Sequence, residues 1–192
     1  MPTELDALDT STIQTLEDHM LAEQAGEDFA AFAELYRRYL CRIYRFVRAQ
    51  TPDDATAEDL TAQVFFKALS SAGTFRGEGS YRSWLFSIAR NTLATWRTAD
   101  GRQVAVEAVP DQHDPSPTPA VVAIAQEERG LVWRAVATLP PAQREVIALR
   151  YIDDLSTEEI ARITNRTRGA VRILLHRARN KLRHLFEGKD LL

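Results

Sequence analysis

The stretch from Leu155 to Leu185 constrains the fold most, because its pattern fits two helices joined by a tight turn. Ser156, followed three residues later by Glu159, is a capping box, which starts a helix by satisfying free backbone N–H groups. Asn165 tolerates the left-handed backbone of a sharp turn, and Thr167 is a good N-cap for the second helix. The second helix carries an apolar stripe at helical spacing, made up of Val171, Leu174, Leu175, Ala178, Leu182 and Leu185. We therefore predict a helical hairpin with one buried face.

The remaining surface of the second helix is strongly basic. Between Arg162 and Arg183 the chain has eight Lys and Arg residues and no Asp or Glu. A capped short helix, a tight turn and a basic second helix are typical of a helix-turn-helix, whose second helix fits the major groove of DNA. A solvated basic face on an ordinary helical hairpin is the alternative interpretation.

Composition limits the class of protein. The 192 residues are 45% hydrophobic and 27% charged with a net charge of −3, as expected for one or two ordinary globular domains. The single cysteine, Cys41, excludes an internal disulfide, and the absence of a leader-like or membrane-length apolar run predicts a cytoplasmic protein. The four histidines are scattered, with no metal-ligand spacing and no nucleophile–base spacing. We therefore expect no metal, no cofactor and no enzymatic activity.

The first 27 residues are acidic and contain no Lys or Arg. Few large apolar side chains are present, so we predict that residues 1–27 form a flexible arm with a transient helix around Ile13 to Ala25. The arm is either a solubilising tail or a competitor of DNA for the basic helix. The sequence leaves both interpretations open.

Residues 28–98 form the first predicted domain, with helices over 28–50, 55–71 and 81–98. In the second of these helices, the side chains expected to face inward are Leu60, Val64, Phe65, Ala68 and Leu69, and those expected outside are Glu58, Asp59, Thr61, Gln63 and Lys67. The loop at 72–80 is rich in glycine but lacks the GxxxxGK[ST] spacing of a nucleotide-phosphate loop. Aromatic and Arg side chains beside such a loop suit an unstacked single strand, although Trp84 is more often a core residue.

Proline marks the boundary between two domains. Four of the eight prolines lie between residues 110 and 119, so residues 99–120 are predicted to be an extended linker. Residues 121–186 then form a second helical domain that ends with the helix-turn-helix, and 187–192 are a tail. The fold class is therefore all-α, with two small helical domains joined by an extended Pro-rich linker.

Four segments in order resemble a bacterial RNA polymerase sigma factor of the extracytoplasmic-function (ECF) type, in the sigma-70 family. The segment FAELYRRYLCRIYRFV resembles the opening helix of the family's region 2, and DDATAEDLTAQVFFKAL resembles its helix for docking core polymerase. The segment TFRGEGSYRSWLFSIARN resembles its minus-ten promoter element. The segment that begins LPPAQREVIALRY and ends at Arg183 resembles region 4, which binds the minus-thirty-five element. The resemblance covers most of the chain.

The resemblance implies a sigma factor that performs no bond chemistry. Such a chain binds the beta-prime clamp of core RNA polymerase and directs the polymerase to promoters. It contacts the promoter DNA both as a duplex and as a melted single strand. Members of the family are often restrained by an anti-sigma factor, so we expect such a partner here. The implied polymerase-binding residues are Asp59, Leu60, Gln63 and Phe66. The implied minus-ten residues are Arg76, Gly77, Ser80, Tyr81, Arg90, Asn91 and Thr95. The implied minus-thirty-five residues are Thr167, Arg168, Arg172, Ile173, His176 and Arg179.

Two other classes of function would each account for part of the sequence. A stand-alone helix-turn-helix regulator would explain the last domain but would leave the first domain and the linker without a role. An enzyme acting on nucleic acid would need a cluster of metal-binding or nucleophilic residues that the sequence lacks. Duplex binding without polymerase distinguishes the first alternative, and nuclease assays distinguish the second.

Overall fold

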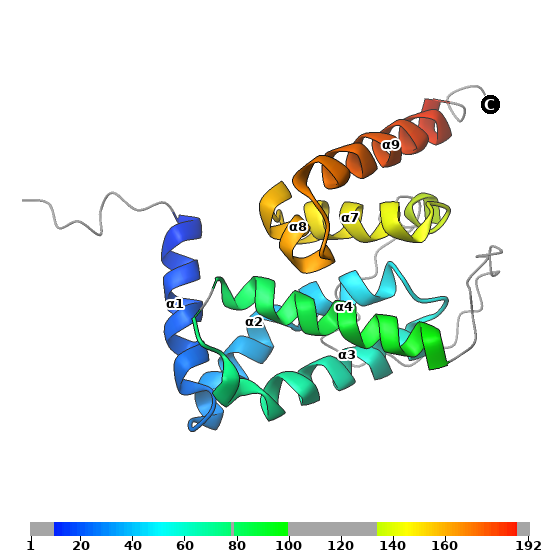
Figure 1. Cartoon of the computed structure of the whole chain (residues 1–192). Helices are drawn as coiled ribbons and strands as arrows, with labels where there is room; N and C mark the ends of the chain where they lie inside the picture. Colours follow the sequence, from blue (N-terminus) through cyan, green and yellow to red (C-terminus); the bar gives the residue numbers. More distant parts are fainter. Residues whose placement is uncertain (1–9, 78, 100–133, 188–192) are drawn as a thin grey trace, which may run out of the picture.

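The computed structural model describes residues 10–77, 79–99 and 134–187, and over these residues it is helical with no strand. The helices are α1 (Thr10–Gln24), α2 (Phe29–Arg48), α3 (Asp54–Ser70), the short 3-10 helix η2 (Ala72–Thr74), α4 (Tyr81–Ala99), α7 (Pro141–Ile152), α8 (Thr157–Thr164) and α9 (Arg168–Glu187) (Figure 1). The all-α prediction is confirmed. None of the helices in the described ranges has both the length and the apolar character needed to cross a membrane.

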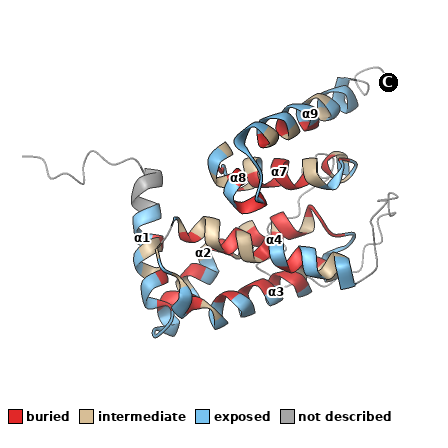
Figure 2. Ribbon diagram, in the orientation of Figure 1, coloured by how far each residue is buried: buried red, intermediate tan, exposed pale blue. Residues whose placement is uncertain are grey.

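The first helical body consists of α1 to α4. Its centre is the antiparallel pair of helices α2 and α3. Asp28 and Asp53 cap α2 and α3, because their carboxylates accept hydrogen bonds from the backbone N–H groups of Ala30 and Thr56 at 2.8 and 2.7 Å. Helix α3 packs against both α2 and α4. The largest fully buried side chains of this body include Phe46, Phe86, Leu35, Ile43 and Leu85. Figure 2 shows these buried faces turned toward one another.

Helix α1 lies where the predicted arm was expected to form a helix, around Ile13 to Ala25, but the helix is packed against the rest of the first body and is not part of a flexible arm. The helix packs against α2 and α4, with Ala22 and Asp18 only 1% and 3% exposed. The Asp18 carboxylate accepts hydrogen bonds from the Tyr39 hydroxyl and, at 2.9 Å, from Arg38. Small buried side chains and the buried Asp18–Tyr39 hydrogen bond hold this helix in place. Because the helix has few large apolar residues, its packing is not evident from the sequence. Residues 1–9 lie outside the described ranges.

The second helical body consists of α7, α8 and α9. The capping box at the start of α8 is confirmed: Glu159 N–H donates to the Ser156 hydroxyl, and Ser156 N–H donates to the Glu159 carboxylate at 2.8 Å. Asn165 ends α8 in the predicted left-handed conformation, with φ of 51°. Buried Arg144 donates to the carbonyls of Ala137 and Leu139 at 2.6 and 3.0 Å, and thereby ties α7 to the end of the preceding turn.

Three predicted burial assignments differ in the structure. Thr61 was expected outside, but it is 4% exposed and its hydroxyl donates to the Ala57 carbonyl at 2.7 Å, so it needs no water. Leu69 and Leu185 were expected inside, but they are 40% and 38% exposed. Both lie in the last turn of their helix, α3 and α9 respectively. The predicted linker at 99–120 falls outside the described residues, apart from Ala99.

The two helical bodies pack against each other. Helix α8 lies on α4, and α7 lies on α2 (Figure 1). The buried side of α7 therefore faces both α9 of its own body and α2 of the other. This packing brings together residues that are more than 50 positions apart in the sequence, and it decides which of the predicted DNA-binding residues are accessible.

Candidate nucleic-acid interface

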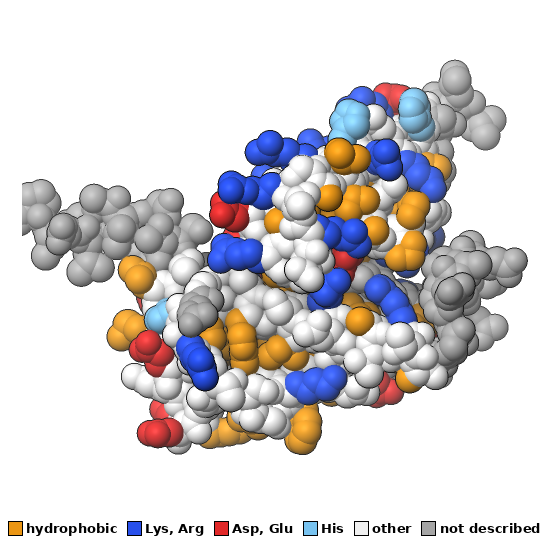
Figure 3. Space-filling model, viewed as in Figure 1, with side chains coloured by type: hydrophobic (Ala, Val, Ile, Leu, Met, Phe, Trp, Pro, Cys, Tyr) orange, Lys and Arg blue, Asp and Glu red, His pale blue; other side chains and the backbone are white. Residues whose placement is uncertain are grey.

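The outer face of α9 carries the predicted minus-thirty-five residues. Its inner face is Val171, Leu175 and Ala178, which are at most 2% exposed. All six predicted residues are on the surface: Thr167, Arg168, Arg172, Ile173, His176 and Arg179. In Figure 3 the Lys and Arg side chains gather over α8 and α9. The helix-turn-helix therefore presents a basic face to solvent, as a groove-binding helix requires.

Local contacts position this helix. The Ala170 N–H donates to the Thr167 hydroxyl at 3.1 Å, so Thr167 caps the helix as predicted. Arg168 forms a surface ion pair with Glu158 at 3.4 Å, an interaction that contributes little in water and that a phosphate can replace. Ile173 is 54% exposed among basic side chains, where an apolar side chain can contact a thymine methyl group.

The loop that carries the predicted minus-ten residues Arg76, Gly77 and Ser80 lies beside α1. Gly77 and Gly79 have positive φ angles of 72° and 96°, which favour glycine. A Cβ atom at Gly77 would lie 2.8 Å from the His19 ring, so the helix closes directly over the loop. The His19 ring also meets Phe75 edge-on at 5.4 Å between centroids. Arg76 is exposed next to this contact.

Tyr81 is not on the surface, unlike the prediction that it contacts DNA. It is 3% exposed, and its ring packs against Phe75, Tyr39 and Trp84 with centroids 5.4 to 5.8 Å apart. Burial raises the pKa of its hydroxyl, which has no hydrogen-bond partner among the described residues. Tyr81 therefore supports the loop from within. Ser80 precedes it and caps α4 by accepting a hydrogen bond from the Ser83 N–H at 3.2 Å.

The minus-ten residues on α4 lie on two faces. Asn91 and Thr95 are exposed, and the Thr95 hydroxyl donates to the Asn91 carbonyl at 3.0 Å. Arg90 instead points to the second body, where its Nε lies 3.1 Å from a carboxylate oxygen of Glu145. Successive helix positions differ by about 100°, so these neighbours separate. Arg90 and Asn91 were both predicted to contact the minus-ten element. In the structure Asn91 faces solvent, whereas Arg90 faces the second body.

The predicted polymerase-docking residues lie on α3. Asp59, Gln63 and Phe66 share its exposed face, and Phe66 is 72% exposed, which is unusual for a phenylalanine. Leu60 is 2% exposed and belongs to the core, so it supports this helix and does not reach its surface. Among the described residues no group of His, Cys, Asp and Glu side chains is arranged to hold a metal ion.

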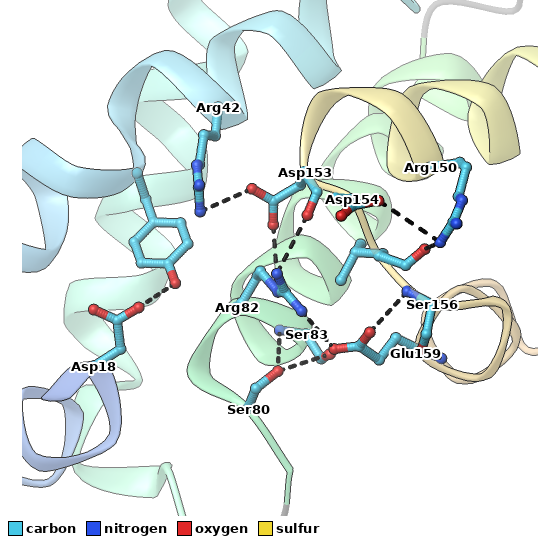
Figure 4. A network of polar contacts seen from close by, with 12 residues as sticks. Asp18, Arg42, Ser80, Arg82, Ser83, Arg150, Asp153, Asp154, Ser156 and Glu159 are labelled. Carbon is cyan, nitrogen blue, oxygen red and sulfur yellow. Dashed lines mark hydrogen bonds and ion pairs between the residues drawn. The ribbon is translucent and has the colours of Figure 1, made fainter. Parts of the chain in front are cut away.

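A network of charged side chains joins the two bodies (Figure 4). Arg82 of α4 donates to the Glu159 carboxylate at 2.9 Å and to the Asp153 backbone carbonyl at 3.2 Å. The Asp153 carboxylate lies 3.0 Å from Arg42 of α2 and 3.5 Å from Arg82. Four residues of this contact were not predicted as site residues, because no local spacing links positions so far apart: Arg42, Arg82, Asp153 and Glu145.

Burial controls the charge state of Asp153. Its side chain is completely buried, and burial raises the pKa of the carboxyl to about 6, against the opposing effect of Arg42 and Arg82. Neither arginine makes a well-aligned hydrogen bond to this carboxylate, although both are within ion-pair distance. Burial also acts on Glu159, but hydrogen bonds from Ser156 and Arg82 outweigh it and lower the pKa of that carboxyl.

Comparison with known proteins assigns both helical bodies to known families of domains. Residues 35–103 match the family profile of sigma-70 region 2, and residues 129–182 match that of sigma-70, region 4. The chain is 31% identical to the ECF RNA polymerase sigma-E factor of Escherichia coli over 180 residues, which cover 88% of this chain and 94% of the relative. It is 34% identical to the ECF RNA polymerase sigma factor BldN of Streptomyces coelicolor over 84% of this chain, and spans 62% of the length of that relative.

Two solved structures share the fold. One is CnrH in complex with the cytosolic domain of CnrY, with a TM-score of 0.68 and 24% identity, covering 90% of this chain and 99% of CnrH. The other is RpoE of Bartonella quintana in complex with the anti-sigma factor NepR, also with a TM-score of 0.68 and 24% identity, covering 82% and 98%. The relationship to sigma-E and the matches to both family profiles show the family. The chain belongs to the extracytoplasmic-function sigma factors, which act in transcription initiation by RNA polymerase.

Proposed function

We propose that this chain binds core RNA polymerase in the cytoplasm, directs it to promoters and helps to melt them, and that it performs no bond chemistry itself. The observation that carries the DNA-binding part is the exposed basic face of α9, held in a capped helix-turn-helix. Arg172 and Ile173 are exposed on this face, so we assign them to base readout or close groove contact.

We assign minus-ten recognition to the loop before α4 and to one face of that helix. Arg76 is exposed on the loop, and Asn91 and Thr95 are exposed on the helix, where they can contact an unpaired strand. Flipping a base out of the stack costs a few kcal/mol, so a preformed loop and nearby cations make melting easier. Gly77 and Ser80 complete the proposed loop contact.

We assign polymerase docking to the exposed face of α3, with Phe66 as its apolar anchor. An aromatic side chain that is 72% exposed gains most when a partner covers it. Asp59 and Gln63 lie on the same face and supply polar contacts at its edge. An anti-sigma partner is a further proposal, supported by the RpoE–NepR complex named above.

The experiment is run-off transcription with core RNA polymerase on fragmented genomic DNA from the source organism, with and without this chain. Discrete transcripts that require the chain are expected, and their start sites would give both promoter elements. A Phe66→Ala variant should lose transcripts at limiting polymerase, while Asp154→Asn, a change at an exposed acid outside the proposed sites, serves as the matched control. Specific duplex binding by the chain alone, without any polymerase-dependent transcript, would favour a stand-alone regulator.

A further inference from the structure

Helix α1 and the turn after it touch the loop before α4 at two places (Figure 1). We call residues 72–77 and 79–80 the glycine loop. A Cβ atom at Gly26, in the turn after α1, would lie 3.0 Å from the Cα atom of Gly73. A Cβ atom at Gly77 would lie 2.8 Å from Cε1 of the His19 ring. Neither approach leaves room for a side chain at the glycine, so the glycine loop rests directly on α1 and its turn.

His19 belongs to a series of contacts between rings beneath the glycine loop. Its ring meets Phe75 edge-on, with the centroids 5.4 Å apart. Tyr81 lies 5.8 Å from Phe75 on one side and 5.6 Å from Tyr39 on the other, again edge-on. The Tyr39 hydroxyl then donates a hydrogen bond to Asp18, the residue before His19 on α1. Helix α1 therefore holds both ends of this series of rings, and the loop is supported before any DNA arrives.

Gly77 is the position at which this support matters most. Its φ angle of 72° is readily adopted by glycine, but glycine also has more alternative conformations than any other residue. The His19 ring lies against Gly77, so it restricts those alternatives from outside the loop. The ring is itself restrained, because its Nε2 lies 3.3 Å from the Glu23 carboxylate. A loop that is ordered in advance loses less conformational entropy when it binds a partner.

We infer that α1 is part of the minus-ten site, and that His19 is a positioning residue that holds Gly77 for the capture of an unpaired base. The His19 side chain is 34% exposed, and Arg76 is exposed on the same loop, so a base can enter beside both. The inference deepens the proposed function and rests on it. It gives the acidic N-terminal segment a part in promoter melting, which is neither of the roles that its composition suggested.

The test measures the affinity of core polymerase carrying the full chain for fork-junction DNA from a mapped promoter. One abasic nucleotide is moved through the unpaired minus-ten strand, and the position at which it weakens binding most identifies the captured base. His19→Ala should weaken binding of the intact fork about tenfold, an effect similar to the loss of one base-stacking contact. The same variant should weaken binding of that abasic fork very little. A general loss of stability would weaken binding of both forks equally.

Two further variants make the test specific. Met20→Ala, at the next position on α1, removes a side chain that is 61% exposed and should leave both affinities unchanged. Gly77→Asn places a Cβ atom against the His19 ring, although Asn tolerates the positive φ angle. It should reproduce the loss caused by His19→Ala. In the double variant the two losses should be far from additive, because the ring that Asn meets is gone.

The support of the loop is also measurable without DNA or polymerase. Amide hydrogen exchange in peptides that cover residues 72–80 of the free chain should become several-fold faster in His19→Ala and stay unchanged in Met20→Ala. Unchanged exchange in His19→Ala, or an equal loss of affinity for intact and abasic forks, would overturn the inference. If exchange responds as expected but the unsubstituted chain confers no fork binding on core polymerase, the proposed function fails and the support of Gly77 by His19 stands.

Discussion

The buried carboxyl of Asp153 gives the sharpest quantitative prediction. Its pKa is raised from 3.8 to about 6 by burial between the two bodies, so the folded chain holds a proton over a pH range in which the unfolded chain has lost it. The free energy of unfolding therefore falls as the pH rises through that range. The difference between 3.8 and about 6 corresponds to about 3 kcal/mol. This contribution is fully present below pH 3.8 and is lost as the pH passes 6.

Asp153→Asn isolates this contribution, because the amide has nearly the shape of the carboxyl but does not titrate. Urea unfolding, followed by far-ultraviolet circular dichroism at several pH values from 4 to 7.5, should show the variant becoming more stable than the unsubstituted chain as pH rises. The difference should grow by about 2 kcal/mol across the series, which is most of the effect, because pH 4 already lies just above 3.8. Other groups that face this carboxyl, namely Arg42, Arg82, Glu159 and Asp18, are the same in both proteins and cancel in the comparison.

The control is Asp154→Asn, one residue further on, whose side chain is 93% exposed. Its stability difference from the unsubstituted chain should stay nearly constant with pH. A constant difference for Asp153→Asn as well would refute the assigned burial effect. A difference of opposite sign, in which the ionised chain gains stability with rising pH, would mean that the ion pairs with Arg42 and Arg82 outweigh the burial of the charge.

Four further changes test other parts of the molecule. Ser156→Ala removes the cap of α8 and should lower the free energy of unfolding by about 1 kcal/mol in urea titrations; no change would contradict the capping role. Arg172→Ala should weaken promoter binding by about 1–3 kcal/mol and unequally across promoter variants, whereas an equal loss on every sequence would identify a phosphate contact. Asn91→Ala should slow open-complex formation, measured by permanganate footprinting, more than it weakens initial duplex binding. Phe66→Ala should weaken affinity for core polymerase while leaving binding of the isolated chain to minus-thirty-five duplex unchanged.

The sequence predicted those features that depend on neighbouring residues. The capping box at Ser156 and the cap at Thr167 involve side chains that bond to backbone groups three positions away. The left-handed turn at Asn165 depends on the backbone conformation that this residue type tolerates. Helical spacing likewise predicted the exposed basic face of α9. These parts of the fold and site follow from local chemistry, so one sequence is enough to predict them.

The features that the sequence did not predict depend on long-range pairing. Helix α1 is packed because Asp18 bonds to Tyr39 and Arg38, about twenty positions away. Arg82 meets Glu159 across 77 positions. Helical periodicity gives the direction in which a side chain points from its own helix. It does not give the residue of another helix that this side chain meets. For this reason the acidic segment 1–27 was predicted to be a flexible arm. Arg90 was likewise predicted to contact DNA, although in the structure it pairs with Glu145.

The two contacts of Glu159 affect whether the domains of this chain can be exchanged with those of related proteins. One of its carboxylate oxygens accepts a hydrogen bond from the Ser156 N–H inside the helix-turn-helix. The other oxygen accepts a hydrogen bond from the Arg82 guanidinium of region 2. The same side chain thus completes a local motif and recognises the other half of the chain. In a chimera, region 4 of this protein would keep its motif in any host, but it would pack in the same way only on a region 2 that offers a guanidinium at the position of Arg82. Compatibility between the two halves would then depend on very few positions, and domain exchange between relatives would change how the two bodies pack without changing the helix-turn-helix itself.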